Sequence, residues 1–286
     1  MSNISLQSKL PYYFAMEIRP QITPEDVQSK SGDHLREKLV ITNLFQVNVV
    51  TYVMSHHDRI LIGGVSLNKG SVTLDAPAGL SAEYLLERRE LGLVCLEGNV
   101  DVTVDGQKYA LDSEDIIYIG RGSKVISLTG TAEIYLTSSM CHADHPTTHV
   151  KKADADSIVI GDAKNSSERT LRKYIHDQGV ASSSMAMGIT TLHEGSVWNT
   201  MPCHVHERRT EAYLYFALDE SQKVIHLFGK PDQSRNFVLS NKQAVISPAW
   251  SIHTGAGTTS YKFVWSTAGE NITYSDFNPV ETKNLK

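Results

Sequence analysis

Hydrophobic residues along this chain fall in short runs that are separated by polar turn residues. The runs are rich in Val, Ile, Leu and Tyr, a composition that favours strands, and the helical period is weak throughout. Many short strands with frequent turns predict an all-β fold of the sandwich or closed-barrel type. The runs predicted as strands are Leu93–Leu96, Asp101–Val104, Gln107–Leu111, Ile116–Ile119, Glu133–Leu136, Ala212–Ala217, Val224–Phe228, Phe237–Leu239, Ala244–Ser247 and Tyr261–Trp265.

One predicted strand pair carries its own turn signal. The segment VDVTVDGQKYAL places Asp105 and Gly106 between two alternating runs, and Asp-Gly suits a tight hairpin turn with positive φ. Helical signal is limited to two places. Thr23–Lys38 begins with a Thr, Pro and Glu start signal, and Ser167–Ile175 is predicted to form one or two helical turns. We therefore expect few and short helices.

Two parts of the chain resemble one another. The segments ERRE at Glu87 and ERRTE at Glu207 each begin a run of predicted strands. Similar apolar segments follow, DIIYIGRGSKV in the first half and QAVISPAWSIH in the second. Between them, Cys141–Asp156 is polar and lacks apolar periodicity, which is typical of a linker. We predict two copies of one β fold, over residues 1–145 and 146–286.

Composition indicates a globular protein. The 286 residues are 41% hydrophobic and 21% charged, with a net charge of −5, so wholesale disorder is not expected. The negative charge makes nucleic acid and anionic membranes poor partners. No apolar stretch is long enough to span a bilayer, no signal peptide is visible, and three widely spaced cysteines argue against a disulfide framework. We expect a cytoplasmic protein.

The segment WNTMPCHVHERRTEAYLYF carries the candidate chemistry. His204 and His206 are two residues apart, so on a strand both imidazoles would face the same side, whereas Cys203 would face away. Glu211 would rejoin that face if the chain bends in the polar ERRT stretch. His253 can supply a fourth ligand from a neighbouring strand. Three imidazoles and one carboxylate suit Zn, Mn, Fe, Co or Ni, and ligand type alone does not choose among them.

These residues resemble those of a known family. H-x-H-x4-E followed by a distal histidine is the metal-ligand pattern of the cupin superfamily. Nearly the whole chain resembles the 5-keto-4-deoxyuronate isomerase (4-deoxy-L-threo-5-hexosulose-uronate ketol-isomerase) family within it. The similarity runs from Leu39 to Asn271, and the first forty residues, which resemble the family less, are interpreted as an extension. The matching blocks are HHDRILIGGV, YLLERRELG, WNTMPCHVHERRTEAYLYF, QAVISPAWSIHTGAGT and FVWSTAGEN.

The resemblance implies a fold, a cofactor and an activity. The fold would be a bicupin, two jelly-roll barrels per chain, assembled as a homo-hexamer. One zinc ion per chain, or another divalent metal, would be bound in the second barrel by His204, His206, Glu211 and His253. The activity would convert 5-keto-4-deoxyuronate into 3-deoxy-D-glycero-2,5-hexodiulosonate during breakdown of pectin and related uronate polysaccharides. In the first half Val125 aligns with His253 and no histidine pair precedes ERR, so we expect that barrel to be metal-free and structural.

Such an isomerisation moves a hydrogen from C2 to C1. A bound metal would polarise the carbonyl and stabilise the enediolate, while a general base would carry the proton. Glu207 is the candidate base, with an ion pair to a neighbouring arginine as the alternative interpretation. Arginine suits the planar carboxylate of the substrate. The candidate substrate-binding residues, each of which could instead be a surface charge or a packing residue, are Arg169, Lys173, Arg208, Arg209 and Trp250.

Two other functions fit the same four ligands. A metal-dependent dioxygenase would hold iron or nickel and consume O2, and activity without air would exclude it. A sugar-binding cupin would use the metal as a structural clip, and substrate turnover would exclude it.

Overall fold

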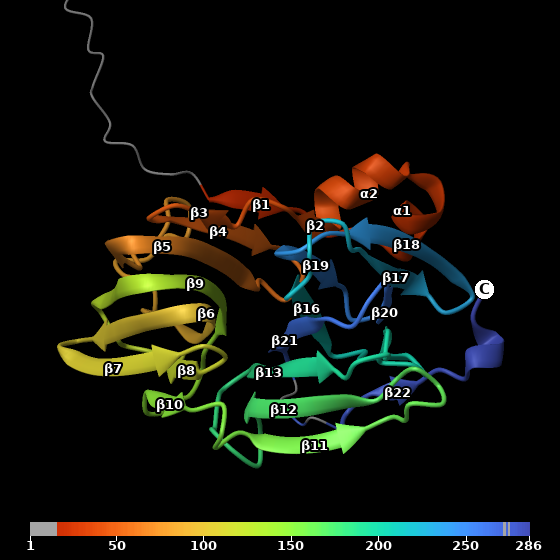
Figure 1. Cartoon of the computed structure of the whole chain (residues 1–286). Helices are drawn as coiled ribbons and strands as arrows, with labels where there is room; N and C mark the ends of the chain where they lie inside the picture. Colours follow the sequence, from red (N-terminus) through yellow and green to blue (C-terminus); the bar gives the residue numbers. More distant parts are fainter. Residues whose placement is uncertain (1–15, 271–272, 274) are drawn as a thin grey trace, which may run out of the picture.

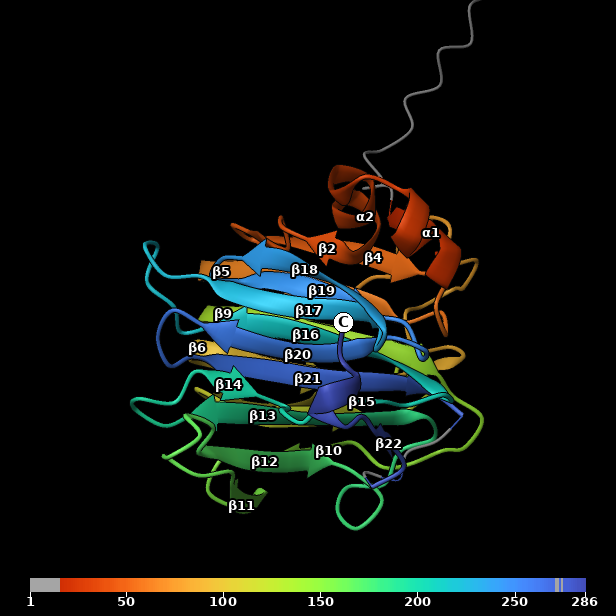
Figure 2. The same cartoon turned by 90° about the vertical axis from the view of Figure 1, so that its right-hand side faces the viewer.

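The computed structural model describes residues 16–270, 273 and 275–286, and most regular structure in them is β. A nine-stranded sheet is formed mainly by the first half of the chain, and a seven-stranded sheet mainly by the second half. Figure 1 shows the two sheets side by side, with α1 (Pro24–Ser29) and α2 (Gly32–Leu39) on the side formed by the second half of the chain, and Figure 2 shows the same helices from a second direction. The all-β expectation with few short helices is confirmed.

The strands fall into four sheets. The first sheet contains β1 (Glu17–Arg19), β3 (Phe45–Gln46), β4 (Val49–Ser55), β5 (Leu61–Thr73), β6 (Arg89–Val104), β7 (Gln107–Asp112), β8 (Ile116–Ile119), β9 (Ile126–Met140) and β10 (Thr148–Val150). The second contains β2 (Val40–Ile41), β11 (Asp156–Ile160), β12 (Arg169–Ile175), β13 (Met185–Leu192), β16 (Arg209–Phe216), β19 (Gln243–Ser247) and β21 (Lys262–Gly269). The smaller sheets are β14 (Trp198–Asn199), β17 (Val224–Lys230), β18 (Gln233–Leu239) and β20 (Ile252–Gly257), and the pair β15 (His204–Val205) and β22 (Asn278–Pro279). A 3-10 helix, Thr282–Asn284, lies near the C-terminus.

The predicted hairpin joins β6 and β7. Val104 pairs with Gln107, and the turn residues Asp105 and Gly106 have φ of 47° and 89°, as the Asp-Gly signal requires. The two strands predicted at Leu93–Leu96 and Asp101–Val104 are one continuous strand, β6. Its pairing with β9 shifts register inside that strand, and this β-bulge accounts for the break in the apolar pattern.

The helix predicted at Ser167–Ile175 is wrong, because the segment forms strand β12. Its residues pair with β11 on one side and β13 on the other, and Leu171, Tyr174 and Ile175 are buried in the core. Pairing with two strands and burial outweigh the weak local helix signal.

The first described residues are part of the fold, so the interpretation of residues 16–40 as an extension is wrong. β1 pairs in parallel with β4, and β2 pairs with β19 of the second sheet. The predicted helix start is real, with a capping box at Thr23, but the helix ends at Ser29 and a second begins after Ser31. The apolar residues of this region, Ile22, Val27, Leu35 and Leu39, are buried in the main core. Residues 1–15 lie outside the described residues.

Within the described part, none of the helices is long and apolar enough to cross a membrane.

The two halves of the chain share one large apolar core. Val53, Ile62 and Tyr135 from the first half belong to the same buried cluster as Met187 and Val264 from the second. The segment predicted as a linker contains β10, which pairs with β8 and so adds a strand to the first sheet. Packing and strand pairing therefore tie the halves to each other.

The same strand pairing occurs in both halves. β6 pairs with β8 and β9 in the way that β16 pairs with β19 and β21. Leu91 lies opposite Ile119 and Ser138, whereas Glu211 lies opposite Ser247 and Thr267. Leu91 thus stands where the second half has Glu211. The interior around Leu91 is filled by apolar side chains, including Leu61, Leu93, Ile117 and Leu136.

The loop between β4 and β5 connects three parts of the molecule. His57 is buried and accepts a hydrogen bond at Nε2 from the backbone N–H of Ile22, at 3.2 Å. The carboxylate of Asp58 accepts one from the backbone N–H of Thr210, at 2.6 Å. Burial, assisted by the neighbouring His56, lowers the pKa of His57 from 6.5 to about 4. His57 is therefore neutral in the folded protein near neutral pH.

His57 should make the fold sensitive to acid. Between pH 6.5 and about pH 4 the unfolded chain binds a proton at this residue that the folded chain does not bind. The unprotonated His57 therefore stabilises the folded protein fully above pH 6.5, and this stabilisation is lost as the pH falls. The variant His57→Gln keeps a hydrogen-bond acceptor but does not titrate. We expect its free energy of unfolding to fall less on acidification than that of the parent protein, by up to about 3 kcal/mol. Urea unfolding at several pH values measures this, and identical pH slopes for both proteins would contradict it.

Candidate metal centre

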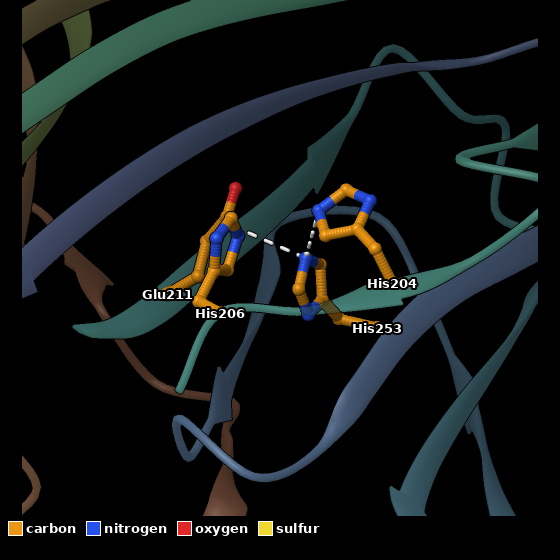
Figure 3. A group of neighbouring side chains, drawn as sticks. All are labelled: His204, His206, Glu211 and His253. Atoms are coloured by element: carbon orange, nitrogen blue, oxygen red, sulfur yellow. Dashed lines mark hydrogen bonds and ion pairs between the residues drawn. The ribbon is translucent and has the colours of Figure 1, made fainter. Parts of the chain in front are cut away.

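Four side chains from separate parts of the second half converge on one point (Figure 3). His204 lies on β15, Glu211 on β16 and His253 on β20, and His206 follows β15 directly. The bend predicted after the histidine pair is present. Glu207 adopts a φ of 64°, and the chain then enters β16. This bend returns Glu211 to the side on which both histidines lie.

The spacing of the four ligand atoms fits a single cation. They all lie within 4.8 Å of one another. Oε2 of Glu211 is 2.6 Å from Nε2 of His206 and 3.2 Å from Nε2 of His253, and Nε2 of His253 is 3.1 Å from Nε2 of His204. Ligand atoms around a tetrahedral zinc ion, with bonds of about 2.0–2.1 Å, are about 3.3 Å apart. The donor set therefore fits a divalent metal.

Two of these histidines are held from behind at Nδ1. Nδ1 of His253 lies 3.3 Å from the carbonyl oxygen of Ser251, and when Nε2 binds a metal the protonated Nδ1 donates to such an oxygen. Nδ1 of His206 accepts a hydrogen bond from Nε of Arg209 at 3.2 Å and lies 3.3 Å from the carbonyl oxygen of Asp276. Both imidazoles thus present Nε2 to the common point.

The electrostatics of the group also suit a cation. Burial lowers the pKa of His204 to about 2 and also lowers that of His206. Burial alone would raise the pKa of Glu211, but His253 and His206 outweigh it and hold that pKa well below its usual value. Neutral imidazoles and an ionised carboxylate are the forms that bind metals.

Cys203 faces away from the group, as its position in the sequence predicts. It is fully buried and packs with Val205 and Ile252 in a small apolar cluster. It therefore behaves as a small hydrophobic residue.

The four side chains adjoin a cavity of about 410 Å³, lined by all of them except His253. Two of the predicted substrate-binding residues, Arg169 and Lys173, lie on β12 and line the same cavity. Nζ of Lys173 is 2.6 Å from Oδ2 of Asp156, and Nη1 of Arg169 donates to the carbonyl of Ser167 at 2.7 Å. Tyr213, Phe263, Trp265 and Phe277 give the cavity an aromatic wall.

The remaining predicted residues lie elsewhere or are engaged in other contacts. Glu207 and Arg208 are exposed and do not line the cavity, and Arg208 is 3.7 Å from Glu270. Trp250 is half-buried and packs against the main core. Arg209 lines the cavity, but its guanidinium also donates to the carbonyl of Thr273, at 2.9 Å.

The sequence interpretation missed the C-terminal segment. β22 pairs with β15, so this segment lies against the histidine pair. The ring centroid of Phe277 is 4.6 Å from that of His204, and the Asp276 carbonyl contacts His206. Only the short apolar stretch around Phe277 marks the segment in the sequence, and nothing in it indicates where it docks.

The fold and this donor set define a cupin-like protein with a buried site of three histidines and one glutamate. Solved structures share the fold, and two of them serve as examples. An IolB-like protein from Salmonella typhimurium LT2 has a TM-score of 0.64 at 14% identity, covering 77% of this chain and 86% of that one. An oxalate decarboxylase from Lactobacillus farciminis has a TM-score of 0.57 at 10% identity, covering 78% of this chain and 82% of that one.

The chain belongs to the KduI/IolB family, whose model matches residues 43–283. Relatives named 4-deoxy-L-threo-5-hexosulose-uronate ketol-isomerase match almost its whole length. The relative from Oceanobacillus iheyensis is 41% identical over 277 residues, which is 95% of this chain and 100% of the relative. Those from Bacillus subtilis and Dickeya dadantii are each 40% identical, with the same coverage. The predicted family is confirmed.

Loss of one imidazole should weaken metal binding severely. We expect His204→Ala to lower the affinity for zinc by more than about 100-fold. The substitution removes a side chain that binds the metal directly, which costs more affinity than removing a residue that only hydrogen-bonds to a ligand. Cys203→Ala should keep the affinity of the parent protein, since its side chain faces the apolar cluster. Competition with a chromogenic chelator measures both. Equal affinity of His204→Ala and the parent would show that the metal binds elsewhere.

Proposed function

We propose that this chain is a metal-dependent ketol-isomerase that converts 5-keto-4-deoxyuronate (4-deoxy-L-threo-5-hexosulose uronate) into 3-deoxy-D-glycero-2,5-hexodiulosonate. The observation that carries the proposal is 41% identity along the full length of a relative named for this activity. The buried group of three histidines and one glutamate supports it, because aldose–ketose isomerisation needs a polarised carbonyl and a proton carrier.

The metal in this proposal is held by His204, His206, Glu211 and His253. Zinc is our choice, because the reaction requires no change of metal oxidation state and zinc suits these ligands, although other divalent ions suit them as well. When bound, the metal would polarise the C1 carbonyl and stabilise negative charge as the C2 proton leaves.

The substrate carboxylate is assigned to Arg169 and Lys173. Both line the cavity next to the metal ligands, and both come from one face of β12 because they are four residues apart on a strand. Arg169 can present a planar fork to a carboxylate. The ammonium of Lys173, which also pairs with Asp156, is a single point charge, so we assign the main contact to the planar guanidinium of Arg169.

The proton transfer is assigned to a group at the cavity in preference to Glu207, which is exposed and does not line it. Among the described residues that line the cavity, Glu211 is the only carboxylate. In this proposal it is also a metal ligand, and its pKa lies well below the usual value, which makes it a weak base. Tyr213, whose hydroxyl is 3.3 Å from that of Thr200, is a further protic group at the cavity.

From the resemblance of the sequence to its family we also propose the domain organisation, the oligomeric state and the cellular location of the protein. The chain would be a bicupin with a metal-free barrel over residues 1–145 and a metal-binding barrel over residues 146–286. The repeated strand pairing and the replacement of Glu211 by Leu91 support this division. Six chains would form a hexamer that acts in the cytoplasm on uronates released from pectin and related polysaccharides.

Turnover without air tests the proposed activity. We expect the purified, zinc-loaded protein to form the 2-ketose product under anaerobic conditions, followed by proton NMR. His253→Ala should lose at least about 1000-fold in rate, because metal polarisation contributes several kcal/mol. Turnover only in air would favour a dioxygenase, and substrate binding without turnover would favour a sugar-binding protein.

Two further substitutions test the assigned side chains. Arg169→Gln should lower kcat/KM by about 100-fold, mainly through KM, because a charged contact to the substrate is lost. The zinc content should not change. Glu207→Gln should keep activity within about twofold, since an exposed side chain outside the cavity is not expected to contribute. A large loss of kcat in Glu207→Gln would instead make Glu207 the base.

A further inference from the structure

A second cavity, of about 520 Å³, lies in the first half of the chain. It is close to the start of β6 and the end of β9, and no residue lines both this cavity and the one at the metal centre. Its charged lining residues are four arginines, Arg59, Arg88, Arg89 and Arg121, joined by His142. None of the described residues that line it is Asp or Glu. In a chain of net charge −5, this is a local concentration of positive charge.

Arg89 forms the rigid base of this arginine cluster. It is 5% exposed, and its guanidinium donates to Oγ and the carbonyl of Ser138, at 3.0 and 2.6 Å, and to the carbonyl of Arg59, at 2.7 Å. These partners are neutral oxygens, so they fix the guanidinium without neutralising it. The positive charge therefore remains available to a ligand.

Arg59 is the most available member of the cluster. It is exposed, and no described residue accepts a hydrogen bond from its guanidinium. Its backbone is in the left-handed region, with a φ of 51°, which residues other than glycine seldom adopt and which is often found at functional sites. Arg121 is partly engaged, because its Nε donates to Asp144 at 2.7 Å.

We propose that this cavity binds a small polyanion, either a phosphate ester or a di- or tricarboxylate, through Arg59, Arg89 and Arg121. The planar guanidinium fork matches both phosphate and carboxylate groups. Leu80, Leu85 and Met140 line the same cavity and provide apolar surface for the carbon skeleton.

The chain neutralises part of this positive charge with carboxylates that do not line the cavity. Arg121 pairs with Asp144 at 2.7 Å, and Arg88 lies 3.7 Å from Glu87. Residues 1–15, which precede the first described strand, contain no Asp or Glu. The lining residues contain none either. A separate anion is therefore the occupant that complements Arg59 and Arg89, for which the described residues supply no ion pair.

Isothermal titration calorimetry of the zinc-loaded full chain tests the proposal with three probes. These are inorganic phosphate, glucose 6-phosphate and citrate, with uncharged glucose as the control ligand. We expect at least one anion to bind at about one per chain with Kd below about 1 mM, more weakly at high salt. Binding of glucose 6-phosphate would identify phosphate esters, and binding of citrate alone would identify carboxylates.

Charge-matched variants locate the site. Arg59→Gln should weaken binding by at least about tenfold, because one charge-assisted contact is lost. Lys108→Gln removes the same charge from an exposed side chain of β7 and should bind as the parent does. Arg169→Gln, in the catalytic cavity, should also bind as the parent does.

Three results would overturn the proposal. The first is no binding of any anion probe. The second is equal weakening by Arg59→Gln and Lys108→Gln, which would indicate a general effect of net charge. The third is loss of binding in Arg169→Gln but not in Arg59→Gln, which would place the probe in the catalytic cavity. An unchanged thermal midpoint of Arg59→Gln without ligand confirms that the variant is folded.

Discussion

The burial of one carboxylate among three imidazoles is the constraint on which the second half of this molecule depends. A buried carboxylate is costly unless it is paired, and Glu211 is paired with His206 and His253 at 2.6 and 3.2 Å. Several separate features hold these groups together. The chain bends at Glu207, Asp58 of the first half fixes the start of β16, and the C-terminal segment lies against His204 and His206.

The two halves show how one strand arrangement accommodates two interiors. β6 and β16 have equivalent neighbours, yet one carries Leu91 and the other Glu211 at the same position. In the first half the surrounding side chains close into an apolar core. In the second half they surround a cavity beside a site suited to a metal. Buried residues of both halves belong to one shared core.

The features that the sequence predicts well are local ones. The Asp105-Gly106 turn and the common side of His204 and His206 follow from spacing and turn chemistry alone. Nearness in sequence to a metal ligand does not predict a place in the site. Glu207 and Arg208 follow His206 directly in the sequence, but their side chains are exposed. The strand at Arg169–Ile175 and the docking of Phe277 depend on partners distant in the chain. No local pattern carries that information, which is why the first was predicted as a helix and the second was missed.

The central claim is that the four converging side chains bind a metal that the isomerisation requires. The most direct measurement removes all metal with a chelator and then restores zinc stepwise while the rate of conversion of 5-keto-4-deoxyuronate is recorded. The account predicts an inactive metal-free protein whose activity rises linearly and stops rising at about one ion per chain. Full activity in the metal-free protein, or a rise that continues well beyond one ion, would contradict it.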